Sequence, residues 1–342
     1  MILFNEQEDD MGKDFSRRKF IKNAGSAGLA FGTGMVAAPY LSFGAQPTKL
    51  VTGTLAGGWS RIANGLLIDK KFGAKHDIDF EVFNIYGSVR QYYADIMTGN
   101  FDIGVGTWDS FAKFAAKGAP IKIAGIITTG SLAGYIAGPN GPNSLAELKG
   151  KTLGAMTVSG TYNMGRTWAK AFDGIDFLKD LTVQNVPNPP AVLGLVAANR
   201  ADAGLIWEHT LSAGLNKIPG SKVFLNLNDH YRKHTGRDMP YFAVAINTKR
   251  MARHPKDSLA KAMSAYSDMF QWITDNKTGF TQQASRVKLT PKVLETAVNS
   301  GRMKFFTRLM TDAKNREDVL HAANIMNKAG TLPKVNESFF AV

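Results

Sequence analysis

The sequence predicts an α/β protein with two domains and a cleft between them. Two observations lead to this fold class. The chain has 342 residues, of which 44% are hydrophobic, so it is long enough to form more than one packed core. Short apolar runs also alternate with amphipathic stretches along most of the chain, which is the spacing of strands and helices in α/β units.

The first α/β series precedes a break rich in glycine, proline and asparagine at residues 138–143. Its expected strands are residues 50–53, 78–84, 101–105 and 121–127, and its expected helices are residues 61–71, 89–97 and 108–117. Because strands and helices alternate regularly here, this part of the chain predicts one α/β unit.

The second series begins after the break, where Ser144 and Glu147 match a helix capping box. Its expected strands are residues 152–156, 181–186 and 203–207, and its expected helices are residues 162–172 and 190–198. A strand at 241–246 and a mainly helical C-terminal part are expected to complete the first unit. The predicted domains are therefore a discontinuous first lobe of residues 46–130 and 240–342, and a second lobe of residues 131–239.

The candidate ligand-binding residues follow from this arrangement. A chain that leaves one domain, builds another and returns crosses between them at least twice, so a cleft lies between the lobes. Such clefts commonly bind small ligands, and parallel sheets place their binding loops at the carboxyl ends of strands. The loops after the predicted strands contribute Gly57, Gly58, Trp59, Ser60, Tyr86, Gly87, Ser88, Thr107, Trp108, Asp109, Ser159, Gly160, Thr161, Tyr162, Trp207 and Glu208.

Two of these loops, residues 57–60 and 159–162, each open a predicted helix. Free backbone N–H groups and the helix dipole favour an anion at such a position. A tight turn and ordinary helix capping are alternative explanations of the same residues. The tryptophans Trp59, Trp108 and Trp207 either line an apolar pocket wall or pack in the cores of the lobes.

Charged residues near the predicted cleft are further candidates for contact with the ligand. Arg61, Arg90 and Arg166 lie near the starts of predicted helices, where they either pair with an acidic ligand or lie on the surface. Glu208 would repel an anion, so we expect it to meet an amine or to pair with an Arg or Lys side chain.

The composition argues against several other function classes. The chain has no cysteine, which excludes disulfides, thiolate metal sites and a cysteine nucleophile. The net charge is +13, but the basic residues are scattered rather than grouped in blocks, so we expect no nucleic-acid binding. His230 and His234 are one helical turn apart, with only Asp229 and Asp238 as nearby acidic residues, so we expect no metal site. No dinucleotide fingerprint or phosphate loop is present, and no cofactor is expected.

The first 45 residues predict an export signal. Arg17 and Arg18 precede a weakly apolar, glycine-rich stretch at residues 23–38, and this order resembles a twin-arginine signal. The apolar stretch is shorter than the roughly 20 residues that span a bilayer as a helix. We therefore expect cleavage near residue 45 and a soluble protein in the periplasm.

Four segments together resemble the signatures of a known protein family. Residues 97–106 and 116–121 resemble the first-lobe signature of periplasmic binding proteins for nitrate, sulfonates, taurine and thiamine precursors. Residues 144–154 and 192–208 are similar to the second-lobe signatures of the same family. The resemblance extends over about residues 48–335 and implies a two-lobed type II periplasmic binding protein fold, with an ABC permease as partner.

The expected function is solute binding rather than catalysis. A monomeric component of an ABC importer would capture a small anion, such as a sulfonate, taurine, nitrate or an organic acid, by closing its two lobes. The alternative is an enzyme of the same fold that acts on a small aromatic or pyrimidine-like substrate. Relatives of that kind rely on cysteine, which this chain lacks, so such an enzyme would use other groups, such as Asp109, Glu208 and His209. The loop at 56–60 is more glycine-rich than the usual family form, so the resemblance does not identify the ligand.

Overall fold

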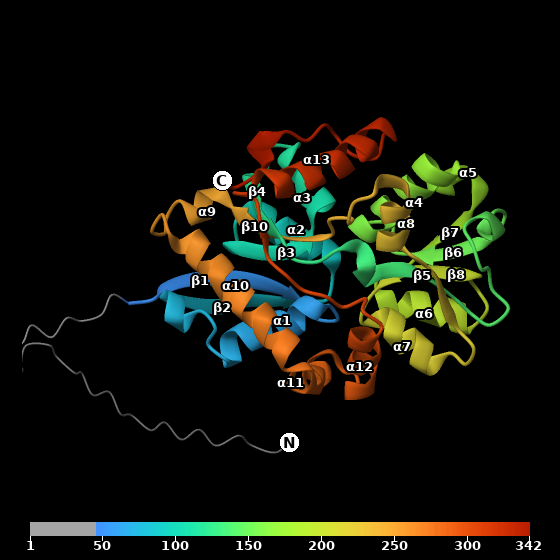
Figure 1. The fold of residues 1–342 in the computed structure, drawn as a ribbon, viewed down its shortest axis with the longest axis horizontal. Coiled ribbons are helices and arrows are strands. Elements are labelled where there is room, and N and C mark those ends of the chain that lie inside the picture. Colours follow the sequence, from blue (N-terminus) through green and yellow to red (C-terminus); the bar gives the residue numbers. More distant parts are fainter. Residues whose placement is uncertain (1–45) are drawn as a thin grey trace, which may run out of the picture. The chain divides into compact units, whose positions relative to one another are not determined.

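Residues 46–342 are described by a computed structural model, shown as a ribbon in Figure 1. The predicted export signal, with Arg17 and Arg18, lies outside the described residues. Over the described part, the strands form two mixed sheets, one of six strands and one of five, and helices flank each sheet. The predicted α/β class is therefore confirmed.

The first lobe begins with alternating strands and helices: β1 (Thr48–Leu55), α1 (Trp59–Asp69), β2 (Ile78–Tyr86), α2 (Val89–Thr98), β3 (Ile103–Thr107), α3 (Trp108–Ala115) and β4 (Ile121–Ile126). The strand β1 pairs in parallel with both β2 and β3. The carboxyl ends of these three strands consequently lie at the same edge of the sheet, where α1, α2 and α3 begin.

The chain then forms the second sheet and its helices: β5 (Ala133–Ala137), β6 (Thr152–Ala155), α4 (Gly160–Asp173), α5 (Phe177–Asp180), β7 (Thr182–Asn185), α6 (Pro189–Ala197), β8 (Ala203–Trp207), α7 (Thr210–Lys217), β9 (Lys222–Asn226) and α8 (Leu227–Thr235). The strand order is β7-β6-β8-β5-β9. The strand β6 runs parallel to β7 and β8, whereas β5 runs antiparallel to β8 and β9. The ends of β6 and β8 thus point the same way.

The rest of the chain returns to the first sheet through β10 (Phe242–Asn247), α9 (Thr248–Met251), α10 (Ser258–Asp275), α11 (Lys277–Thr281), α12 (Pro291–Asn299), β11 (Arg308–Leu309) and α13 (Ala313–Lys328). The strand β10 runs antiparallel between β3 and β4, and the sheet order is β11-β4-β10-β3-β1-β2. The helices α12 and α13 also contact α7 and α4 of the second lobe, respectively. The exact lobe boundaries at residues 130 and 239 stay predictions.

Two crossovers join the sheets, residues 127–132 and 236–241, and they run side by side in opposite directions. Thr129 and Pro240 form an antiparallel bridge. The N–H group of Gly130 donates to the carbonyl of Met239 at 2.9 Å. We call these two segments the crossover ribbon. The two connections between the lobes are thus hydrogen-bonded to each other.

Candidate ligand-binding site

A narrow cavity lies between the two lobes, at the carboxyl ends of β1, β3 and β8. The space that the centre of a water molecule can occupy inside this cavity has a volume of about 40 Å³. One water needs at least about 10–15 Å³ on this measure, so the cavity has room for a solute of only a few heavy atoms. We call it the interlobe pocket, and its lining residues are Leu55, Gly58, Trp59, Ser60, Val89, Tyr93, Val105, Gly106, Thr107, Ser159, Gly160, Thr161, Trp207 and Phe242.

Helices from both lobes begin at the interlobe pocket, among them α1 from the first lobe and α4 from the second. Gly58 precedes α1 and offers no side-chain cap, whereas the Ser159 hydroxyl caps α4 by accepting from the N–H group of Tyr162. Within residues 46–342, the first two N–H groups of each helix have no hydrogen-bond acceptor. Free N–H groups at the positive end of a helix dipole favour an anionic or acceptor-rich ligand.

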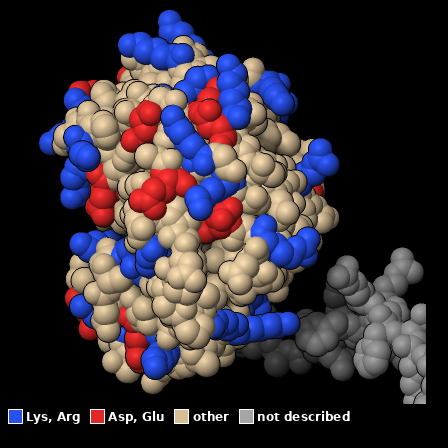
Figure 2. All heavy atoms as spheres, turned by 90° about the vertical axis from the view of Figure 1, so that its right-hand side faces the viewer, with Lys and Arg blue, Asp and Glu red and all other residues tan. Residues whose placement is uncertain are grey.

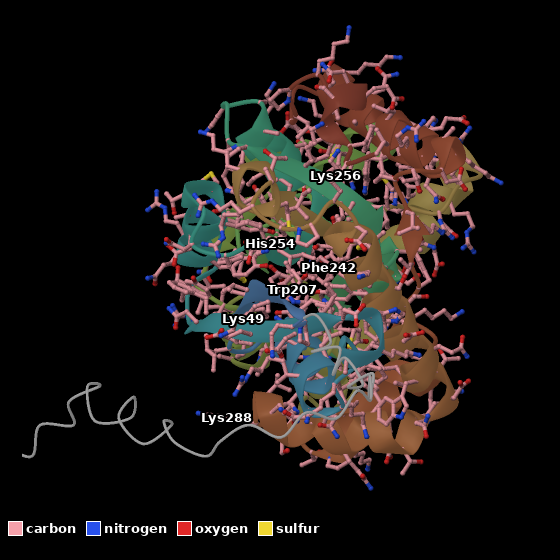
Figure 3. All side chains as sticks on the ribbon, turned by 90° about the vertical axis from the view of Figure 1, so that its left-hand side faces the viewer. Lys49, Trp207, Phe242, His254, Lys256 and Lys288 are labelled. Atoms are coloured by element: carbon pink, nitrogen blue, oxygen red, sulfur yellow. The ribbon has the colours of Figure 1, made fainter. Side chains whose placement is uncertain are left out.

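Aromatic side chains form much of the pocket wall. The ring of Trp59 stacks on Phe242 with 6.1 Å between centroids, and it packs on Phe305 at 4.7 Å. Trp207 reaches the same pocket from the end of β8, and Figure 3 labels it beside Phe242 near the middle of the molecule. Trp59 is only 2% exposed, so this ring serves both as pocket wall and as part of the first-lobe core.

None of the residues that line the interlobe pocket carries a formal charge. Arg61, Arg90 and Arg166 lie outside the lining, and the Arg166 guanidinium instead lies 6.0 Å from the ring centre of Tyr162. Lys and Arg side chains are interspersed with Asp and Glu on the face of the molecule shown in Figure 2. Because its lining has no charged side chain, the interlobe pocket offers N–H groups and hydroxyl groups, rather than a cation, to a bound ligand.

Buried polar groups join the two lobes beside the pocket. The Thr161 and Tyr241 hydroxyl oxygens are 2.5 Å apart. The Asn163 amide of α4 donates to the Asp109 carboxylate of α3 at 2.8 Å. Asp109 is fully buried and does not line the pocket. Its carboxylate instead binds a side chain of the second lobe and so holds the two lobes together.

Gly160 lies where the backbone of the second lobe closely approaches the first lobe. A Cβ atom at this position would overlap the side-chain oxygens of Thr107 and Asp109 in the first lobe. Close backbone approach of this kind is a position at which only glycine fits. The contact between the lobes therefore depends on the absence of a side chain at residue 160.

Glu208 forms another polar contact between the lobes. Its carboxylate is fully buried at the end of β8, where it accepts from the Nε group of Arg302 at 2.5 Å and from the N–H group of Ser212 at 3.1 Å. Arg302 lies after α12, in the part of the chain that leads to β11 of the first sheet. The expectation that Glu208 pairs with an Arg or Lys side chain is confirmed.

His209 lies next to Glu208 and is 4% exposed. Burial lowers the pKa of this imidazole from 6.5 to about 4, and a hydrogen bond with the backbone of Gly57 acts in the opposite direction. The ring is therefore neutral at pH 7. Because Gly57 belongs to the first lobe, protonation of His209 would charge a buried contact between the lobes.

We expect the folded protein to lose stability in acid, because the buried imidazole of His209 resists protonation. Its folded pKa of about 4 lies below its ordinary value of 6.5, so the contribution is fully present above pH 6.5 and is lost as the pH falls towards 4. The full effect is on the order of 3 kcal/mol. Denaturant unfolding across this pH range should show that His209→Gln has a flatter pH dependence than the unchanged protein. Parallel curves for the two proteins would contradict this assignment.

Half of the sequence-predicted site residues line the interlobe pocket: Gly58, Trp59, Ser60, Thr107, Ser159, Gly160, Thr161 and Trp207. The others lie outside the lining: Gly57, Tyr86, Gly87, Ser88, Trp108, Asp109, Tyr162 and Glu208. Among these, Tyr86 and Trp108 are buried, and each has a partner inside the protein. The Tyr86 hydroxyl donates to Asp95 at 2.6 Å, and the Trp108 indole N–H donates to the Pro240 carbonyl at 2.9 Å.

Six lining residues are absent from the sequence prediction: Leu55, Val89, Tyr93, Val105, Gly106 and Phe242. Phe242 is the clearest case. It begins β10, which runs antiparallel to β3, so its amino end rather than its carboxyl end meets the pocket. The rule that binding loops follow the carboxyl ends of parallel strands therefore cannot predict Phe242. Tyr93 lies four residues after Val89 on α2, so the two side chains share one face of the helix.

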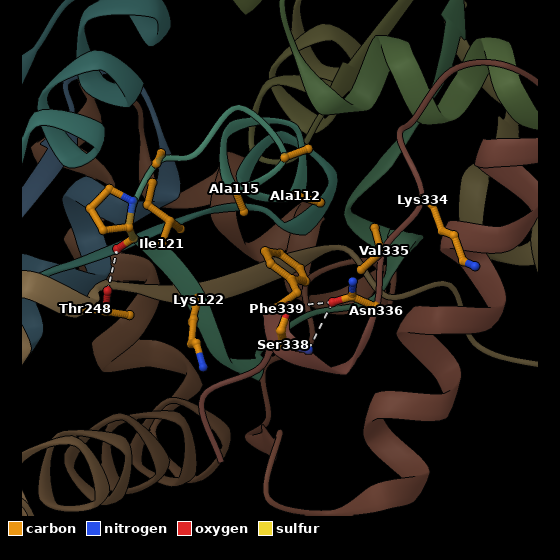
Figure 4. A pocket seen from close by; sticks show the side chains of 13 residues that line it. Ala112, Ala115, Ile121, Lys122, Thr248, Lys334, Val335, Asn336, Ser338 and Phe339 are labelled. Carbon is orange, nitrogen blue, oxygen red and sulfur yellow. Dashed lines mark hydrogen bonds between the residues drawn. The ribbon is translucent and has the colours of Figure 1, made fainter.

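Another surface pocket lies between α3 and the C-terminal segment of the chain (Figure 4). Lys122 and Lys334 are the charged residues of its lining, and Ala115, Ile121 and Phe339 supply apolar surface. No sequence-predicted site residue lines it. The interlobe pocket is therefore the site where the predicted loops meet.

Comparison with known proteins gives a family match and several structural matches. A family model described as NMT1/THI5 like matches residues 70–277. No curated protein matches the sequence. The matched residues extend from the end of α1 to α11, so they include strands of both sheets.

Solved structures of binding proteins share the fold. The alkanesulfonate-binding protein SsuA from Xanthomonas axonopodis pv. citri, bound to MOPS, is 17% identical with a TM-score of 0.68, and the match covers 85% of this chain and 96% of that chain. The periplasmic aliphatic sulphonate binding protein SsuA from Escherichia coli is 16% identical with a TM-score of 0.69, covering 86% and 91%. The ligand-binding component of an ABC-type import system from Staphylococcus aureus, with zinc bound, is 12% identical with a TM-score of 0.65, covering 86% and 96%.

At such low sequence identity, these matches show the fold alone. They confirm the predicted two-lobed type II periplasmic binding protein fold. Within residues 46–342, no helix combines the length and the apolar character that a membrane span requires.

Proposed function

The chain belongs to the NMT1/THI5-like family, and from this premise we propose that it is the solute-binding component of an ABC importer, which captures a small anion by closing its two lobes. The observation that carries the proposal is the interlobe pocket, where the starts of α1 and α4 meet from opposite lobes. A ligand that accepts hydrogen bonds from both helix starts would draw the lobes together, because its binding energy depends on their approach.

The chemistry of the pocket narrows the ligand class. Hydroxyl groups of Ser60, Thr107, Ser159 and Thr161 surround the helix starts, whereas Trp59, Trp207 and Phe242 supply an apolar wall. Without a lining cation, a singly charged oxyanion suits the site better than a doubly charged anion, whose desolvation costs more. The small volume favours nitrate or a short sulfonate over a larger sulfonate such as MOPS.

A thermal-shift screen of the purified protein tests the proposal. The panel contains nitrate, methanesulfonate, taurine, acetate, phosphate and MOPS, with pyrimidines as neutral flat compounds. At 100 times its dissociation constant, a true ligand should stabilise the protein by about 2.7 kcal/mol. We expect nitrate or a short sulfonate to give the largest shift and phosphate to give none. Stabilisation by pyrimidines alone would contradict the anion assignment while leaving a binding function in place.

The enzyme alternative has a separate test. Asp109, Glu208 and His209 lie outside the pocket lining, and Glu208 is paired with Arg302, which argues against a catalytic arrangement at the pocket. Incubation of the best ligand with the protein, followed by chromatography, should return the ligand unchanged. Conversion of the ligand in more than one turnover would overturn the binding-protein assignment.

We further propose export to the periplasm and docking on an ABC permease. If the segment with Arg17 and Arg18 is a twin-arginine signal, the combined change Arg17→Lys and Arg18→Lys should leave precursor in the cytoplasm, because the export receptor recognises the arginine pair and not the charge alone. Cell fractionation with immunoblotting measures this. Lys13→Arg is the matched control and should be exported normally. Normal processing of the double variant would contradict the signal assignment.

A further inference from the structure

Two histidines and a carboxylate meet in the second lobe, outside the interlobe pocket. Asp173 is the last residue of α4, and His230 and His234 lie one turn apart on α8. One potential ligand atom from each residue lies within 4.8 Å of the others. From this geometry we propose that Asp173, His230 and His234 form a binding site for a divalent transition-metal ion such as Zn²⁺.

The orientation of His230 favours ligation over a simple ion pair. Its side chain is buried, and its Nε2 atom lies 2.9 Å from Asp173 Oδ2, yet no directed hydrogen bond joins them. Two ligand atoms at this separation, each about 2.1 Å from one ion, form an angle of about 90° at that ion. The ion then lies to one side of the line between the two atoms. A ring nitrogen that points beside the carboxylate oxygen, rather than at it, matches this position.

Neighbouring side chains hold the imidazole rings in place. Phe172 stacks on His234 with 4.6 Å between ring centroids, and it meets the edge of His230 at 5.7 Å. Both rings are therefore packed against the same aromatic side chain without any ion. The ring centroids of His230 and His234 lie 4.9 Å apart.

The ligand set indicates the class of ion. Two imidazoles and one carboxylate suit borderline transition metals, whereas Mg²⁺ and Ca²⁺ prefer sets made only of oxygen atoms. Asp173 and His234 are exposed, so an ion can enter from solvent and keep water molecules as further ligands. Such an ion would join the end of α4 to α8.

The site is separate from the interlobe pocket. The helix α4 has 14 residues and starts at the pocket, so its last residue, Asp173, lies about 20 Å away along the helix. Loss of the ion should therefore leave affinity for the pocket ligand unchanged. The proposal does not depend on the proposed transport function.

Titration of the full chain with Zn²⁺ against a chromophoric chelator tests the proposal. We expect one Zn²⁺ per chain, and at least tenfold weaker binding in His234→Ala and in Asp173→Asn, which change exposed positions. Zn²⁺ should also raise the melting temperature of the unchanged protein, and EDTA should reverse the shift. His234→Ala should lose this effect.

His76→Ala is the matched control, because His76 also contacts a carboxylate, Asp268, at 2.6 Å but belongs to no cluster of three potential ligands in the described part of the chain. Its Zn²⁺ affinity should equal that of the unchanged protein. Absence of saturable Zn²⁺ binding would overturn the proposal. Equal affinity of the unchanged protein and His234→Ala would overturn it as well.

Discussion

Gly160→Asp is expected to weaken ligand binding by roughly 5- to 150-fold, which corresponds to the overpacking cost of about 1–3 kcal/mol. A side chain at residue 160 would overlap Thr107 and Asp109, so the lobes could not reach their present contact. The added carboxylate would also face Asp109. Folding of the second lobe should change little, because a carboxylate is favourable in the first turn of α4. Calorimetry with the best ligand of the screen and a melting curve measure the two effects.

Gly87→Asp is the matched control for this prediction. It adds the same charge before the start of α2, where a Cβ atom would meet no atom within 4 Å. Its ligand affinity should stay within about threefold of the unchanged protein, as for most surface substitutions. An unchanged affinity of Gly160→Asp, together with a sharp fall in melting temperature, would show that this loop only shapes the second lobe.

Arg302→Met is expected to produce the other large effect, also through contact between the lobes. Without Arg302, the buried carboxylate of Glu208 keeps Ser212 as a partner but has no opposite charge. Removal of one partner from a buried pair costs about 3 kcal/mol or more. Opening of the lobes can rehydrate Glu208, so only part of this cost should appear as weaker ligand binding, up to roughly a hundredfold.

A second substitution separates the loss of charge pairing from the loss of packing. Glu208→Gln combined with Arg302→Met removes both charges, so binding should recover much of its strength. Lys49→Met removes an exposed pair with Glu81 and serves as control, with binding expected within twofold. If Arg302→Met binds ligand as tightly as the unchanged protein, the pair has no role in holding the lobes together.

Regular alternation made most of the fold predictable, whereas three of the antiparallel strands did not follow from the sequence. The strands β5 and β9 and the two-residue β11 are absent from the sequence-based prediction. Every residue of β5, Ala133–Ala137, is buried, so it shows no alternation of apolar and polar residues. The strand β9 is partly buried throughout, so it shows no alternation of buried and exposed residues either.

The candidate site was predictable at the level of loops but not of side chains. The rule for carboxyl ends of parallel strands found Ser60, Thr107 and Trp207, because these positions depend on topology. Whether a side chain in such a loop points into the pocket depends on partners far away in the sequence. Trp108 points to Pro240, and Glu208 pairs with a residue 94 positions later. The same holds for Asp173 beside His230, a pairing between two helices that spacing along α8 cannot reveal.

The crossover ribbon constrains how the lobes can move. Sliding one of its strands past the other would break the hydrogen bonds between Gly130 and Met239 and between Tyr241 and Thr128, whereas bending both together keeps them. Rotation about one axis is therefore easier than translation or independent twisting of the two connections. The fraction of molecules with open lobes is then set by the contacts at the closed limit of this rotation.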